Sequence, residues 1–103
     1  MEKKYNIKYL PSFYRDLDAI TDYIKYELQN EAAANRLVDE IENEINKRLK
    51  NPESLEKFQT RRKRLNAYYR IYVKNYTIFY VVKDSTMEVR RIIYSKRNFE
   101  KLI

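Results

Sequence analysis

The side chains best suited to chemistry lie late in the sequence, where arginine, lysine and tyrosine alternate with apolar residues over residues 68–98. Residues 61–103 hold 12 Lys and Arg against 3 Asp and Glu, a net charge of +9, whereas residues 1–60 carry a net charge of −2. A positive field of this kind attracts an anionic partner, either a nucleic acid or an acidic protein, and speeds its encounter. The charge pattern therefore predicts an anion-binding surface in the C-terminal part of the chain.

Several kinds of chemistry are excluded, because the sequence contains neither cysteine nor histidine. Thiolate nucleophiles, Ser-His and Cys-His pairs, and the two commonest zinc ligands are absent with them. Asp16, Asp18 and Asp22 have near-helical spacing, but we interpret them as the solvent face of a helix rather than a metal site. We expect no metal and no cofactor. We also expect no membrane span, because no run of about 20 apolar residues occurs. The lack of cysteine and of a signal-peptide pattern fits a cytoplasmic protein.

The first half of the chain predicts one strand and two helices. Residues 4–10 alternate in polarity as a half-buried strand does. Pro11 suits the first turn of a helix, and the Ser12 hydroxyl is expected to cap its free amides. Apolar stripes at steps of three and four predict a helix of about 18 residues and a second helix over 31–49, which Asn51-Pro52 ends. Such a short connection predicts an antiparallel helical hairpin. The stripes comprise Phe13, Leu17, Ile20, Ile24 and Leu28, then Ala34, Leu37, Val38, Ile41, Ile45 and Leu49.

The second half predicts an antiparallel meander of three strands over residues 67–74, 76–83 and 87–94. Asn75 is the expected positive-φ turn residue, and Asp84-Ser85-Thr86 forms the next turn. In the first of these strands one face is expected in the core (Tyr69, Ile71 and Val73) and the other in solvent (Tyr68, Arg70, Tyr72 and Lys74). The tyrosines of this region are interpreted mainly as core and cross-strand packing.

The fold class is therefore α+β, with an N-terminal strand, an antiparallel helical hairpin packed on an antiparallel β-sheet meander, and a short C-terminal segment. One domain is expected over residues 1–103, since a chain of this length supports a single core. Residues 51–66 show no periodicity and are a candidate mobile loop, whose cationic run Arg61 to Arg64 is interpreted as solvated.

Five features together resemble the RelE/ParE superfamily of type II toxin-antitoxin toxins, closer to its ParE-like branch. They are the strand order, the Asp16-Leu17 pair, the Asn51-Pro52 stop, the run YRIYVKNYTIFY and the closing IIYSKRN. The resemblance implies a cytoplasmic toxin that inhibits growth, stabilises plasmids and is neutralised when an acidic antitoxin wraps around it. It also implies a toxin-antitoxin hetero-oligomer.

The resemblance leaves two kinds of target open. Proteins of the RelE-like branch cut mRNA on the ribosome. They use cations on the sheet face, an arginine on the third strand and acid-base groups near the C-terminus. Arg70, Tyr94 and Arg97 are the weak catalytic candidates here, but Thr77 stands where that branch has arginine and Tyr94 where it often has histidine. A hydroxyl stabilises developing phosphorane charge poorly, and a tyrosine of pKa about 10 is a poor base.

The ParE-like branch, which inhibits DNA gyrase, is therefore favoured over a ribosome-dependent endoribonuclease, and enzymatic activity is not expected. An RNA-binding module without toxicity is a third alternative. Arg90 is left open between a solvated strand cation and an anion contact. The residues expected to contact the antitoxin or the target are Arg70, Tyr72, Arg91, Tyr94, Lys96 and Arg97.

Overall fold

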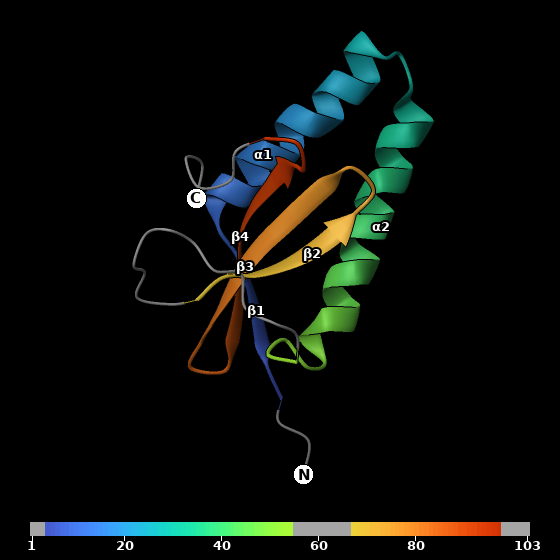
Figure 1. The fold of residues 1–103 in the computed structure, drawn as a ribbon. Coiled ribbons are helices and arrows are strands. Elements are labelled where there is room, and N and C mark those ends of the chain that lie inside the picture. The colour runs from blue at the N-terminus through green and yellow to red at the C-terminus, as the bar shows by residue number, and fades with distance from the viewer. Residues whose placement is uncertain (1–3, 55–66, 98–103) are drawn as a thin grey trace.

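The computed structural model describes residues 4–54 and 67–97, and the predicted helices and strands are all present (Figure 1). Residues 55–66 of the predicted loop, with its cationic run, lie outside the described residues. The C-terminal segment from residue 98 lies outside them as well. No helix within the described ranges is long and apolar enough to cross a membrane. The elements are β1 (Asn6–Tyr9), α1 (Pro11–Asp22), the π-helix η1 (Tyr23–Glu27), α2 (Glu31–Leu49), β2 (Tyr69–Val73), β3 (Tyr76–Lys83) and β4 (Thr86–Tyr94).

The sheet is mixed, with the strand order β1-β4-β3-β2. β2, β3 and β4 form the predicted antiparallel meander, and β1 adds to β4 in parallel. β1 pairs only with the first part of β4, ending where Tyr9 lies opposite Val89. The remaining edge of β4 therefore needs other partners for its backbone groups.

The two hairpin turns place positive φ angles at residues other than the one predicted. Asn75 lies in the β2–β3 turn as predicted, but the positive φ, 54°, falls on its neighbour Lys74. A positive φ at the first central residue alone is typical of a type II′ turn, which matches the twist of the flanking strands. In the β3–β4 turn both Asp84 (48°) and Ser85 (64°) are positive, as in a type I′ turn.

The helical hairpin forms as predicted, but one cap does not. Pro11 begins α1, yet no side chain caps that end, and the Ser12 hydroxyl instead donates to the Arg90 carbonyl of β4 at 2.7 Å. The helix continues as η1, where the Leu28 amide donates to the Tyr23 carbonyl five residues back. Asn30 caps α2 by accepting from the Ala33 amide at 3.0 Å.

Both helices pack on one face of the sheet and bury the main core there. The alternation of β2 is confirmed on this side, because Tyr69, Ile71 and Val73 are buried. The outer face was predicted to be solvated, but it carries a second buried cluster, so the prediction for Tyr68 was wrong. The cause is β3, which is apolar on both faces. This cluster comprises Tyr68, Phe79, Val81 and Ile93.

Candidate functional site

The sheet face opposite the helices carries three arginines around the aromatic ring of Phe79. Arg70 on β2 and Arg91 on β4 both lie opposite Phe79, so these three residues form one row across the sheet. A β-bulge follows, because Phe79 pairs with Arg91 while Tyr80 pairs with Val89, which leaves Arg90 as the additional residue. Bulges re-aim side chains and bring successive residues toward one side. Three cations thus gather on one face, as the charge distribution predicted.

Two of these arginines are already paired with carboxylates of the same chain. Arg90 Nε donates to Glu88 Oε1 at 2.7 Å, and its guanidinium lies 5.7 Å from the centroid of the Tyr68 ring. Burial lowers the pKa of Arg90, but hydrogen bonds to Tyr68 and Glu88 outweigh it and raise the pKa overall. Arg91 forms a two-pronged pair with Asp16 of α1, at 2.6 Å from Nε and 2.9 Å from Nη2. This hydrogen bonding raises the pKa of Arg91.

Asp16 does more than neutralise a charge, because it completes the edge of β4 beyond the end of β1. Its Oδ2 accepts from the Ile92 amide at 3.1 Å, and Ser12 binds the Arg90 carbonyl two residues earlier. The interpretation of Asp16 as a solvent-facing residue was therefore wrong, since its side chain is only 17% exposed. Asp18 and Asp22 do remain exposed. Within residues 4–54 and 67–97, no three metal-ligating side chains gather.

A second group of the predicted residues lies at the end of the sheet formed by the β2–β3 turn and the last residues of β4. Tyr72 is 60% exposed and Tyr94 40%, and both Lys96 and Arg97 are exposed. The Ser95 amide donates to the Asn75 carbonyl at 2.8 Å, which fixes the end of β4 beside the turn. Tyrosine and arginine are enriched in protein-binding surfaces.

The three weak catalytic candidates do not form one group. The Arg97 amide donates to the Tyr94 carbonyl at 3.0 Å, so these two lie in one turn, but Arg70 lies apart from them. Arg70 pairs with Phe79 on the outer face, whereas Tyr94 pairs with Tyr76, which packs against the core on the helix side. Arg70 and Tyr94 therefore lie on opposite faces of the sheet. Thr77 is fully buried, and its hydroxyl is hydrogen-bonded to that of Ser95 at 2.9 Å.

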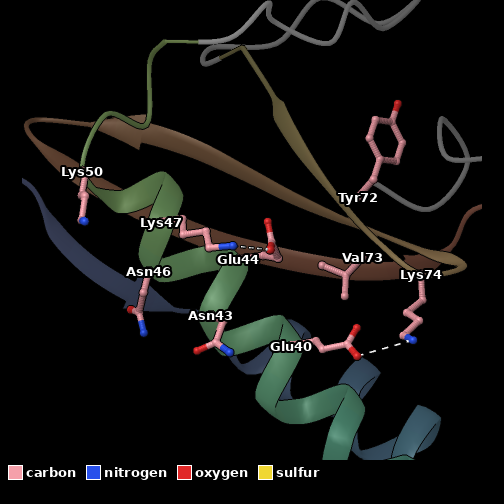
Figure 2. A pocket seen from close by; sticks show the side chains of 9 residues that line it. All are labelled: Glu40, Asn43, Glu44, Asn46, Lys47, Lys50, Tyr72, Val73 and Lys74. Carbon is pink, nitrogen blue, oxygen red and sulfur yellow. Dashed lines mark hydrogen bonds and ion pairs between the residues drawn. The ribbon is translucent and has the colours of Figure 1, made fainter.

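A groove of about 570 Å³ between α2 and β2 was not predicted from the sequence. Figure 2 shows it with α2 below, β2 above, and the side chains of Tyr72 and Val73 projecting to opposite sides of the strand. Arg48 of α2 ties the two elements together, because its Nη1 donates to the Arg70 carbonyl at 3.1 Å and to the Tyr80 hydroxyl at 2.9 Å. The groove is lined by Glu40, Asn43, Glu44, Asn46, Lys47, Lys50, Tyr72, Val73 and Lys74.

The fold and this surface define a small basic α+β protein whose cationic sheet face and exposed tyrosines are suited to binding an acidic macromolecule. Residues 7–99 match the family described as ParE toxin of type II toxin-antitoxin system, parDE, and the chain belongs to this family. The resemblance to the superfamily and to its ParE-like branch is thereby confirmed.

Two solved structures share the fold. A chain of the chromosomal ParDE TA system from P. aeruginosa superposes with a TM-score of 0.74 at 16% identity, covering 89% of this chain and 97% of its own length. A chain of the RelB-RelE antitoxin-toxin complex from Methanococcus jannaschii superposes with a TM-score of 0.52 at 24% identity, covering 93% and 99%. No curated protein matches the sequence.

Proposed function

We propose that this chain is a cytoplasmic toxin that arrests growth by binding DNA gyrase, and that a cognate acidic antitoxin neutralises it in a hetero-oligomeric complex. Membership of the ParE toxin family supports the toxin role. Growth arrest of cells that lose the antitoxin gene would make the pair a plasmid-stabilising device. No cofactor or metal is required for this activity.

The observation that carries the binding role is the separation of the groups that a nuclease would need together. Arg70 and Tyr94 lie on opposite faces of the sheet, so this cation and this base do not converge on one phosphodiester. Arg90 and Arg91 lie at 2.7 and 2.6 Å from carboxylates of the same chain. Their positive charge is thus largely compensated, whereas phosphoryl-transfer catalysis needs preorganised, uncompensated cations around the developing charge.

The same geometry supports an acidic protein as partner. Tyrosine and arginine dominate the energetic centres of protein interfaces, and here Tyr72, Tyr94 and Arg97 are exposed at one end of the sheet. We assign Arg70, Tyr72, Arg91, Tyr94, Lys96 and Arg97 to the interface with the antitoxin or the target. Arg91 would donate to a partner carboxylate while Asp16 remains beside it.

The decisive experiment is induced expression with simultaneous readout of plasmid supercoiling and mRNA integrity. We expect negative supercoiling to be lost while mRNA stays intact. Codon-positioned cuts by the purified protein in a ribosome-containing assay would refute the proposal and support the alternative, a RelE-like endoribonuclease.

The partner proposal has its own test in the salt dependence of antitoxin binding. The triple variant Arg70→Ala, Lys96→Ala and Arg97→Ala removes three cations and leaves the Asp16–Arg91 pair in place. We expect weaker binding and a shallower salt dependence, because charge-assisted contacts steer association and are screened by salt. Equal affinity of the variant and the parent at low and high salt would contradict the electrostatic account.

A further inference from the structure

Thr77 is a small polar residue in the buried stretch of β3. Positions 77–81 of this strand are all buried, and the side chains that follow Thr77 there are Ile78, Phe79, Tyr80 and Val81. Valine fills almost the same volume as threonine and suits a strand equally well, so neither shape nor strand propensity requires a threonine here. A buried hydroxyl is costly unless it is hydrogen-bonded. The partner of this hydroxyl therefore indicates what the threonine does.

The partner is the Ser95 hydroxyl at 2.9 Å, and either oxygen can be the donor. Thr77 lies opposite Ile93 in the β3–β4 register, and Ile93 belongs to the buried cluster of the outer face. Ser95 follows Ile93 by two residues, so its side chain projects to the same face and lies diagonally across from Thr77. The hydroxyl pair thus extends the contact of β3 with β4 beyond Tyr94, the last residue of β4.

Ser95 also begins a change in the direction of the chain. The Arg97 amide donates to the Tyr94 carbonyl at 3.0 Å, which closes a β-turn with Ser95 and Lys96 at its central positions. The Ser95 amide donates to the Asn75 carbonyl at 2.8 Å, and the hydroxyl pair adds a second attachment through the side chain. Two attachments at one residue restrict its rotation more than either does alone. They therefore set the direction in which Lys96 and Arg97 leave the sheet.

This support matters because the cations themselves are exposed. Lys96 and Arg97 lie on the surface, and long cationic side chains lose conformational freedom when a partner immobilises them. A backbone that is ordered before binding lowers this cost. The ring of Tyr94 packs on that of Tyr76, with 6.0 Å between the centroids, so the residue before the turn is held as well.

We infer that Thr77 is a positioning residue, which acts through Ser95 to hold Lys96 and Arg97 in the orientation that binds the target. The inference rests on the proposed function, because it deepens the role given there to these two cations at DNA gyrase. Thr77 contacts no partner itself, since its side chain is fully buried. Its effect on binding therefore depends on one hydrogen bond and not on exposed surface.

Two substitutions of Thr77 should move stability and binding in opposite directions. Thr77→Val removes the hydroxyl and keeps the shape, so we expect it to melt at or above the temperature of the parent. Thr77→Ser keeps the hydroxyl and loses a buried methyl group, so it should melt earlier. A threonine with a purely structural role would give the same order for stability and for binding.

The binding readout is the protein concentration that half-inhibits supercoiling by purified DNA gyrase. We expect this concentration to rise about fivefold in Thr77→Val, the net effect of one hydrogen bond. It should return to the value of the parent in Thr77→Ser. Thr86→Val changes a threonine at the other end of β4 and should inhibit like the parent. Normal inhibition by Thr77→Val, or weak inhibition together with an early melt, would overturn the inference.

Backbone order measured by NMR tests the anchor without gyrase. In Thr77→Val and in Ser95→Ala we expect the order parameter of the Lys96 amide to fall from about 0.85, as in ordered backbone, to below about 0.6. The double variant should lose no more order than either single variant, because both remove the same bond. An unchanged order parameter or additive losses would refute the anchor. If the parent itself does not inhibit gyrase, the proposed function fails and this inference with it, whereas a loosened turn that still inhibits normally refutes only the inference.

Discussion

Replacing Asp16 by alanine tests whether this carboxylate holds α1 to the sheet. The side chain makes three hydrogen bonds, two to Arg91 and one to the Ile92 amide, and is 17% exposed, while that of Arg91 is 26% exposed. Breaking a fully buried ion pair costs about 3–5 kcal/mol and breaking an exposed one about 0–1 kcal/mol. An amide left without an acceptor costs about 1–3 kcal/mol more. For this half-buried pair we expect Asp16→Ala to lower the free energy of unfolding by about 3 kcal/mol.

Urea unfolding of three variants checks this value. Asp16→Asn keeps an acceptor for the Ile92 amide and loses only the charge, so we expect about half the loss. Asp18→Ala changes an exposed carboxylate on the same helix and should stay within about 0.5 kcal/mol of the parent. A value for Asp16→Ala as small as that of Asp18→Ala would show that the pair contributes nothing, and the account of the β4 edge would fail.

Two further predictions separate stability from binding. The side chain of Ile41 is 1% exposed in the main core, so Ile41→Ala should lower the free energy of unfolding by about 2–5 kcal/mol in a thermal or urea melt. Arg97→Ala should change the free energy of unfolding by no more than about 0.5 kcal/mol and abolish growth arrest. An early melt of Arg97→Ala would show that Arg97 is a structural residue. Burial raises the pKa of Tyr80, so the folded state keeps a phenolic proton that the unfolded chain releases near pH 10. The contribution of Tyr80 to stability should therefore be fully present below about pH 10 and be lost above it, so stability should fall less steeply above pH 10 in Tyr80→Phe; equal slopes in an alkaline pH series would contradict this.

The elements could be predicted because each depends on residues close in the sequence. The apolar steps of the two helices and the alternation of β2 and β3 are local patterns, and the core they imply is confirmed by Ile41, Ile45 and Ile71. The position of the β2–β3 turn was local information too, whereas the residue with positive φ was not, since residue preference favoured Asn75 and the turn places the positive φ at Lys74.

The contacts of Ser12 and Asp16 could not be predicted, because their partners on β4 lie more than 70 residues away. Both residues look like ordinary helix-start and helix-surface residues in the sequence. Their roles follow from the parallel addition of β1, which ends at Val89 and leaves the next residues of β4 for α1 to bind. Exposure of the cations late in the chain, by contrast, was predictable for Lys96 and Arg97, which follow the last strand.

The bulge at Arg90 explains why the site residues divide between two faces. Val89 and Ile92 both face the main core although they are three residues apart, which strict alternation forbids, and this spacing is the one sequence signal that could have revealed the bulge. Because the bulge sets Arg90 and Arg91 together on the outer side, each needs a carboxylate, and Glu88 and Asp16 supply them. The same shift of phase returns Tyr94 to the helix side, away from Arg70. One extra residue in β4 thus sets two arginines side by side on the outer face, and each of them is paired with a carboxylate of the same chain. This pairing is the physical basis on which we propose binding of an acidic protein rather than catalysis.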